Sequence, residues 1–209
     1  YLEKSVIRYS RMIGMLDDIK GSERAKVKWL EVGCMYPVLP LALRLLGFDV
    51  TVMENFSFYP EAVISIYKQL ETKHRIRFVD VDISSPKAIL PSDQLSVHDF
   101  VSCMAVLEHI PHTPKHLLTN IRNTLKNKGT AFYEVPNFYY WGNILKMLSG
   151  KHMQQPIEVI YNSGVPFVGH YREYILRDLL YVLRESGFGN FSVNRFNYSV
   201  TPPLGLINT

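Results

Sequence analysis

The chain has 209 residues, of which 47% are hydrophobic and 20% are charged, and its formal net charge is +4. This is the composition of an ordinary globular domain, and the singly scattered Lys and Arg residues argue against a nucleic-acid partner. No apolar run reaches the length of a membrane span, no signal peptide is present, and the two cysteines lack metal-type spacing. We therefore expect a reduced, cytoplasmic protein without a metal, and the start at Tyr1 rather than Met suggests that its original ends are missing.

Hydrophobic periodicity alternates between helix and strand patterns through the first two thirds of the chain. An amphipathic helix over 1–20 comes first, and a polar loop at 84–98 and a turn at 127–129 interrupt the later part. The remaining segments are strands at 26–32, 49–54, 75–83, 99–104 and 130–135, and helices at 38–46, 60–73 and 114–126. This order predicts an α/β fold, with a doubly wound, mostly parallel Rossmann-like sheet and helices on both faces.

The regular alternation ends after residue 136. We expect an aromatic-rich helix at 138–149, an irregular segment at 150–170, an amphipathic helix at 176–187 and a last strand at 191–199. The last strand would form an antiparallel C-terminal edge of the sheet, truncated relative to a complete hairpin. An edge strand lost in this way would leave a sheet edge that needs covering.

Acidic residues follow three successive predicted strands. Glu31 precedes Gly33 at the first strand, Glu54 ends the second, and Asp82 ends the third. The carboxyl ends of parallel strands form the ligand-binding edge of such a sheet. Glu54, about twenty residues beyond the glycine turn, is placed for ribose hydroxyls, Asp82 for an adenine amine and Glu31 for a ligand ammonium. The alternative is that these acids are turn formers or helix caps.

The order of these segments resembles the class I S-adenosylmethionine (SAM)-dependent methyltransferases, of the type 11, 12 and 23 groups, over about residues 25 to 195. The matching pieces are Leu30–Cys34, Val52–Glu54, Asp82–Ile83, Asp99–Val101, Val106–Ile110, Glu134–Asn137 and Gly169–Tyr174. The resemblance implies one domain over 1–209, with an N-terminal helix (1–24), a cofactor-binding core (25–136), an acceptor or lid insertion (137–174) and a C-terminal helix and strand (175–209).

The Pro-Asn pair, the aromatic helix and the Gly-His-Tyr-Arg-Glu-Tyr block are similar to methyltransferases that modify cell-surface sugars and natural products. The resemblance thus implies O-methylation of a small molecule or sugar, with a role in polysaccharide biosynthesis. It also implies SAM as cofactor and S-adenosylhomocysteine as product. The expected cofactor-binding residues are Glu31, Gly33, Cys34, Glu54, Asp82 and Met104.

Two histidines are candidates for the general base that a hydroxyl acceptor needs near neutral pH. His109 lies just past the fourth strand, and His170 lies in the segment expected to close over the substrate. Tyr140, Trp141 and Tyr171 are candidates for the wall of an acceptor pocket, and plain core or lid packing is the alternative. Arg172 is a candidate partner for an acidic acceptor group.

Met35 and Pro37 stand where the family commonly has glycines. Glycine permits positive φ and close approach of a ligand, whereas proline removes an N–H donor. A second hypothesis is therefore a catalytically inactive, methyltransferase-like binding or regulatory module. A nicotinamide-dependent oxidoreductase is disfavoured, because a pyrophosphate needs the glycines that do not follow Gly33.

Overall fold

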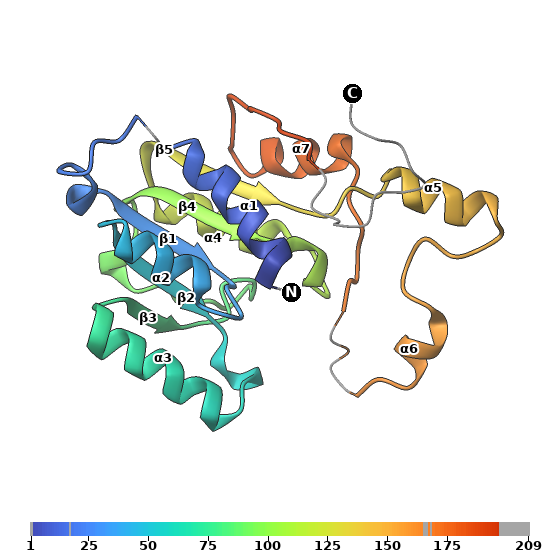
Figure 1. Ribbon diagram of the computed structural model, residues 1–209, viewed down its shortest axis with the longest axis horizontal. Coiled ribbons are helices and arrows are strands. Elements are labelled where there is room, and N and C mark those ends of the chain that lie inside the picture. Colours follow the sequence, from blue (N-terminus) through green and yellow to red (C-terminus); the bar gives the residue numbers. More distant parts are fainter. Residues whose placement is uncertain (1, 17, 165–166, 168, 197–209) are drawn as a thin grey trace.

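The computed structural model describes residues 2–16, 18–164, 167 and 169–196. Its centre is a five-stranded sheet in the order β3-β2-β1-β4-β5, and every neighbouring pair is parallel. The strands are β1 (Lys28–Val32), β2 (Asp49–Glu54), β3 (Arg77–Asp80), β4 (His98–Met104) and β5 (Leu125–Glu134) (Figure 1). The chain moves outward from β1 to β3 and then returns to β4 on the other side of β1. The strand order therefore reverses between β1 and β4, and this switch point is where open α/β sheets bind their ligands.

The central strand shows why the sequence forms a parallel sheet. Residues 29–32 of β1 are all buried, because helices cover both faces of the strand. Trp29 is fully buried, and its ring stacks on Phe100 and Phe132 of the next two strands, with centroids 5.1 and 5.6 Å away. This aromatic ladder joins three adjacent strands on one face of the sheet.

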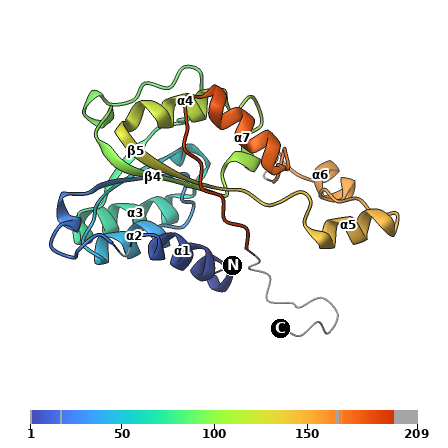
Figure 2. The ribbon, with the colours of Figure 1, turned by 90° about the horizontal axis from the view of Figure 1, so that it is seen from above.

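Helices cover the two faces of the sheet in two groups (Figure 2). One group is α1 (Leu2–Gly14), α2 (Val38–Leu45) and α3 (Glu61–His74), and the other is α4 (Lys115–Thr124) and α7 (Leu176–Glu185). Each group has its own apolar cluster: Leu39 and Leu43 pack on the first face, and Leu117 and Ile121 on the second. The predicted doubly wound arrangement is confirmed.

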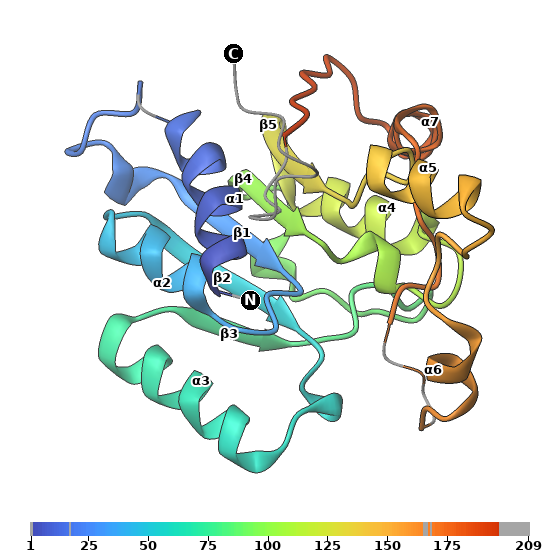
Figure 3. The same cartoon turned by 45° about the vertical axis from the view of Figure 1, so that its right-hand side comes forward.

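The helices α5 (Trp141–Leu148) and α6 (Ile157–Tyr161) lie apart from the sheet, beyond its carboxyl edge (Figures 1 and 3). Neither contains a buried residue. An isolated bridge between Asn137 and Tyr174, with the Phe138 N–H donating to the Tyr174 carbonyl at 3.0 Å, closes the two ends of this region. The acceptor segment, defined here as residues 137–174, is thus a long excursion that returns to its starting point.

The predicted antiparallel C-terminal edge is wrong for the described residues. Residues 191–196 form no strand, and 197–199 lie outside the described part of the chain. The Arg184 guanidinium lies 5.3 Å over the ring of Phe191, which packs against the core cluster beneath α7. This segment therefore runs from α7 to α1, where the Arg11 guanidinium lies 5.0 Å over the ring of Phe196, and it does not pair with β5. The expected turn at 127–129 also differs, because these residues already belong to β5.

Candidate functional site

The end of β1 carries a buried carboxyl group next to the switch point. Glu31 is 1% exposed, and it accepts a hydrogen bond from the Ser102 hydroxyl of β4. Trp29 Nε1 donates to the same hydroxyl oxygen at 2.7 Å. Burial raises the pKa of Glu31 to about 8, against the opposing effects of the Ser102 hydrogen bond and the charge of Arg8. Burial therefore favours the neutral carboxyl group of Glu31, and a cation bound beside it would favour the ionised form.

The turn after β1 contains two residues with positive φ. Gly33 has φ +68°, and a Cβ built there would lie 2.8 Å from Cγ2 of Val106, so this glycine is required by packing as well as by backbone conformation. Met35 also has positive φ, 50°, and 47% of its side chain is exposed. The turn thus accommodates a non-glycine residue because the Met35 side chain lies outside the core. Pro37 precedes the first residue of α2, where a missing N–H costs little.

Glu54, at the end of β2, holds this turn. Its Oε2 accepts from the Met35 N–H and its Oε1 from the Asn55 N–H, both at 3.0 Å. The Tyr59 hydroxyl is a further partner, and burial raises the pKa of Glu54. Each carboxylate oxygen has two lone pairs. A ribose hydroxyl bound here would therefore share the Glu54 oxygens with the turn rather than meet an unused carboxylate.

The other three predicted cofactor residues lie in different surroundings. Cys34 is buried, its Sγ lies 3.6 Å from the Tyr67 hydroxyl, and burial raises the pKa of the thiol. Asp82 is exposed beyond β3, and its Oδ1 accepts from the Ser84 N–H at 3.1 Å and hydroxyl at 2.7 Å. Met104 ends β4 and packs against the same apolar cluster as Trp29. The Asp82 carboxylate thus stabilises the turn after β3, while Cys34 and Met104 belong to the apolar cluster beneath the carboxyl edge of the sheet.

A buried arginine from α1 reaches the same edge, a role that the sequence analysis missed. Arg8 is 5% exposed, and its Nε donates to Glu134 Oε2 of β5 at 2.6 Å. Burial raises the pKa of Glu134, and the Arg8 charge opposes that rise. Helical periodicity predicts only an amphipathic helix over 1–20 and gives Arg8 no role. Only the packing of α1 against the sheet reveals that this guanidinium is buried.

The two candidate catalytic histidines meet in space. The rings of His109 and His170 are T-shaped, with centroids 4.8 Å apart. His109 ends a short 3₁₀ turn after β4, and its Nδ1 lies 3.0 Å from the Gly169 carbonyl oxygen. His170 Nδ1 lies 2.6 Å from Glu173 Oε1. His109 is exposed in part, and the partial loss of water around its ring, together with the neighbouring His170, lowers the pKa of His109. The hydrogen bond with Glu173 raises the pKa of His170.

Glu108 completes this cluster, and the sequence analysis gave it no role. It is 1% exposed, and among the described residues neither carboxylate oxygen has a hydrogen-bond partner. Burial raises its pKa to about 7. One ligand atom from each of Glu108, His109 and His170 lies within 4.8 Å of the others, in an arrangement that can hold a metal ion. We call these three residues the Glu–His–His cluster.

The predicted acceptor-binding residues divide into two groups. The Tyr171 N–H donates to the Glu108 carbonyl at 2.7 Å, which places the backbone of Tyr171 and Arg172 beside the Glu–His–His cluster. The Arg172 side chain is 62% exposed and paired with Asp178 at 3.3 Å, so its charge is already engaged. Tyr140 and Trp141 lie together at the start of α5, with ring centroids 5.3 Å apart. The cluster and the α5 aromatics thus lie on separate parts of the acceptor segment.

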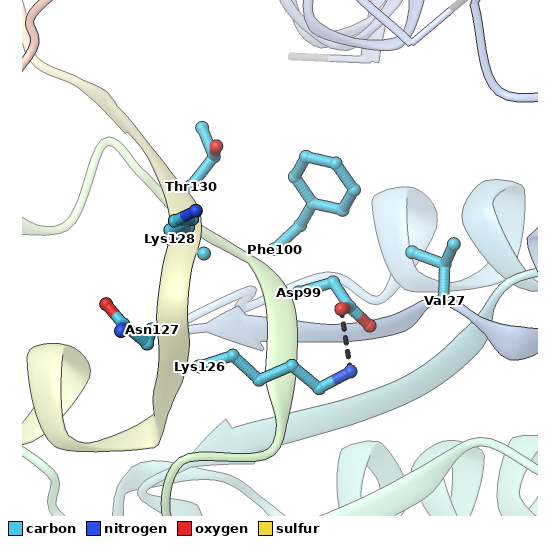
Figure 4. Close-up of a pocket in the computed structure, with 8 residues that line it drawn as sticks. Val27, Asp99, Phe100, Lys126, Asn127, Lys128 and Thr130 are labelled. Atoms are coloured by element: carbon cyan, nitrogen blue, oxygen red, sulfur yellow. Dashed lines mark hydrogen bonds and ion pairs between the residues drawn. The ribbon is translucent and has the colours of Figure 1, made fainter.

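A pocket of about 270 Å³ lies at the opposite, amino edge of the sheet (Figure 4). Asp99, Phe100 and Lys126 line it, and Lys126 Nζ pairs with Asp99 Oδ1 at 2.7 Å. Ligands of open α/β sheets bind at the carboxyl ends of the strands. We therefore place the functional site at the edge formed by Glu31, Glu54 and the Glu–His–His cluster rather than in this pocket.

A buried histidine lies at the amino edge of the sheet. His98, at the start of β4, is 2% exposed, and its Nδ1 lies 3.2 Å from the Thr124 carbonyl oxygen. Burial lowers its pKa to about 4. It is a structural residue at the amino edge of the sheet. The two residues before it also bond to the end of α4, with the Ser96 N–H donating to the Asn123 carbonyl and the Val97 N–H to the Thr124 carbonyl.

The sheet order, the glycine turn and the acidic carboxyl edge define a Rossmann-like protein of the kind that binds a nucleoside-containing cofactor. The chain matches the methyltransferase domain family (Methyltransf_23) over residues 7–193, and it therefore belongs to this family. It is a SAM-dependent methyltransferase. No curated protein sequence matches the chain. Among the described residues, no helix has both the length and the apolar character needed to cross a membrane.

Solved structures show the same fold at low sequence identity. The PH0226 protein from Pyrococcus horikoshii OT3 is 16% identical with a TM-score of 0.58, over 87% of this chain and 80% of that one. The 1,6-didemethyltoxoflavin-N1-methyltransferase of Burkholderia thailandensis, solved with S-adenosylhomocysteine, is 16% identical with a TM-score of 0.55, over 95% and 81%. A SAM-dependent methyltransferase from Methanosarcina mazei is 16% identical with a TM-score of 0.53, over 76% and 78%.

Proposed function

We propose that this methyltransferase transfers the methyl group to a hydroxyl oxygen of a small molecule or sugar. The observation that carries the proposal is the meeting of His109 and His170 beside the buried Glu108, at the end of β4. A neutral hydroxyl is a weak nucleophile, and a positioned imidazole that removes its proton contributes about 10²–10⁴-fold to the rate. An amine acceptor with a free lone pair needs such a group less.

The residues at the carboxyl edge fit the charge of SAM. Glu31 is buried and Glu54 is largely buried, and the charge of Arg8 acts on Glu31. The ligand's ammonium and sulfonium groups would add positive charge beside both carboxyl groups. In this proposal Glu54 binds the ribose, Asp82 the adenine amine and Glu31 the ammonium. Gly33, Cys34 and Met104 line the edge. When bound, SAM supplies an electrophilic methyl group.

The chain itself positions the acceptor and handles its proton. In-line displacement depends chiefly on the alignment of nucleophile and methyl group, which the protein provides by fixing the acceptor. His109 and His170 face the acceptor hydroxyl in this proposal, and Tyr171 lies beside them through its hydrogen bond with Glu108. The rings of Tyr140 and Trp141 wall the far side of the acceptor. Arg172 contacts Asp178 through one guanidinium nitrogen, and its other N–H donors are available to an acidic group of the acceptor.

Cofactor binding is the first test. SAM at about one hundred times its dissociation constant should stabilise the protein by about 2.7 kcal/mol, measured by thermal unfolding. Glu54→Ala should abolish this stabilisation, whereas Glu61→Ala on the exposed face of α3 should leave it unchanged. Circular dichroism of Glu54→Ala establishes that the variant is folded. An unchanged SAM affinity in folded Glu54→Ala would contradict the assignment of the ribose.

The identity of the methylated atom is the second test. We expect a panel of sugars and hydroxylated small molecules, incubated with SAM, to yield an O-methyl ether by mass spectrometry and NMR. His109→Ala should lower the rate by about 10²–10⁴-fold. His152→Ala, an exposed histidine of the same acceptor segment, is the matched control. Methylation of nitrogen or carbon only, across the panel, would overturn the proposal.

A further inference from the structure

The Glu–His–His cluster contains a buried carboxylate whose surroundings do not satisfy it. Glu108 is 1% exposed, and within the described chain both of its carboxylate oxygens lack hydrogen-bond partners. Burial of a carboxylate without partners is costly, and native proteins normally satisfy such groups with a donor, a water or an ion. The same carboxylate lies within 4.8 Å of the ligand nitrogens of two histidines.

The hydrogen bonds of the two histidines leave one nitrogen of each ring for a cation. The Gly169 carbonyl is only an acceptor, so His109 Nδ1 carries the hydrogen in their 3.0 Å contact. The Glu173 carboxylate plays the same part for His170 Nδ1 at 2.6 Å. Metal-binding histidines typically donate one ring N–H to a carbonyl or carboxylate, which fixes the ring and leaves the other nitrogen for the metal. Both rings have this arrangement.

We propose that Glu108, His109 and His170 bind one divalent first-row transition metal ion, such as Mn²⁺, Co²⁺ or Zn²⁺. Two imidazoles and one carboxylate form a mixed nitrogen and oxygen set that suits these ions, whereas Mg²⁺ prefers oxygen ligands alone. Bonds of about 2.1 Å would draw the ligand atoms from within 4.8 Å to about 3–3.5 Å of one another. Because His109 is exposed, the ion can reach the cluster from solvent.

The three protein ligands leave coordination positions for other groups. This part rests on the proposed function: an acceptor hydroxyl bound at one of these positions would have its pKa lowered by the ion and would release its proton to solvent. The resulting alkoxide forms the new C–O bond as the C–S bond of SAM breaks, and the sulfur keeps the electron pair as a neutral thioether. The histidines would then hold the ion instead of removing the proton themselves.

Metal binding is testable without any acceptor. We expect the full chain, freed of metal with a chelator, to bind one Mn²⁺, Co²⁺ or Zn²⁺ per chain by calorimetry, and Mg²⁺ at least tenfold more weakly. The Co²⁺ form should show visible absorption bands of a nitrogen-ligated ion. Absence of binding for all three transition ions up to 1 mM would overturn the proposal, as would equal affinity for Mg²⁺.

Single replacements of the cluster test the assigned ligands. His109→Ala, His170→Ala and Glu108→Gln should each weaken Co²⁺ binding at least tenfold and change the visible spectrum. Glu173→Ala, which removes the acceptor of the His170 N–H, should weaken binding about 10–100-fold. His152→Ala and Glu158→Gln, both exposed in the acceptor segment, are the matched controls and should bind as the parent chain does. Unchanged binding in folded His170→Ala would overturn the site.

Activity separates this inference from the proposed function. If O-methylation proceeds equally with and without chelator, the metal proposal fails while the O-methyltransferase proposal stands, with histidine as the base. If the ion binds and the panel yields no O-methyl product, the metal site stands while the proposed function fails. Loss of activity on chelation, restored at least tenfold by Mn²⁺, Co²⁺ or Zn²⁺, supports both.

Discussion

The two tryptophans of this protein lie in regions that differ in nearly every physical respect. Trp29 is fully buried in β1 and stacks on rings from β4 and β5, whereas Trp141 is 38% exposed at the start of α5. The first region is a sheet covered on both faces. The second is the acceptor segment, whose helices α5 and α6 contain no buried residue.

The two regions differ in the interactions that fix their side chains in place. Trp29 belongs to an extended apolar cluster, so its position is determined by many neighbours at once. The acceptor segment is joined to the sheet domain by a few hydrogen bonds, among them Phe138 N–H to the Tyr174 carbonyl at 3.0 Å and Tyr171 N–H to the Glu108 carbonyl at 2.7 Å. Such a segment can change its acceptor-facing side chains without disturbing the fold.

Replacement of each tryptophan measures this contrast directly. Trp29→Ala should lower the free energy of unfolding by about 3–5 kcal/mol, because it leaves a cavity in the aromatic ladder. Trp141→Ala should change it by less than about 1 kcal/mol, because most of the lost contacts are at the surface. Chemical denaturation followed by circular dichroism gives both values. Similar losses for the two variants would show that α5 is more firmly packed than its exposure indicates.

Two arginines provide the electrostatic counterpart of this comparison. Arg8→Met leaves Glu134 buried without its cation and should cost about 3–5 kcal/mol, and Arg8→Met with Glu134→Gln should recover much of that loss. Arg172→Met breaks the exposed pair with Asp178 and should cost about 0.2–1 kcal/mol. A double-mutant cycle in denaturant measures the coupling. Additive losses for Arg8 and Glu134 would contradict a buried pair.

The buried acid of β1 should make stability depend on pH. Glu31 has a pKa of about 8 in the folded protein, above its ordinary pKa of 4.5. Its contribution to the free energy of unfolding is therefore fully present below pH 4.5 and is lost as the pH rises to about 8. In Glu31→Gln the fall in unfolding free energy over this range should be smaller by up to about 1.4 kcal/mol per pH unit. The groups around Glu31 are Ser102, Glu54 and Arg8.

The matched control for Glu31 lies in the acceptor segment. Glu158, at the start of α6, is exposed, so Glu158→Gln should leave the pH profile of the parent chain unchanged. Urea unfolding at half-unit intervals between pH 5 and 8 gives the three profiles. Parallel curves for the parent chain and Glu31→Gln would mean that Glu31 is ionised in the folded protein.

The smallest effect is expected at the irregular turn after β1. Met35 has φ 50°, a conformation that costs a non-glycine residue about 1–2 kcal/mol. Glycine would remove this cost, but its larger backbone freedom in the unfolded chain would offset about 0.5–1 kcal/mol of the stabilisation. Met35→Gly should therefore stabilise the protein by up to about 1 kcal/mol, or about 2–4 °C in thermal unfolding. SAM affinity, measured by calorimetry, should stay the same or rise. A loss of stability would show that the half-exposed Met35 side chain packs usefully.

The sheet domain and its acidic edge could be predicted from the amino-acid sequence. Strand and helix periods are local, and parallel strands connected by helices bring their carboxyl ends together, so Glu31, Gly33 and Glu54 could be grouped before any coordinates were known. The same reasoning failed for residues 191–196, since periodicity does not distinguish a strand from an irregular segment that runs from α7 to α1.

The contacts within the site, by contrast, depend on tertiary packing. The burial of Arg8 depends on how α1 packs, and the two histidines meet because the chain returns to Glu108 after a long excursion, with His109 and Gly169 separated by 60 residues. No local pattern records such a contact, because it is determined by packing between distant segments. Spacing along the chain indicated no metal site, whereas folding brings Glu108, His109 and His170 together from distant segments.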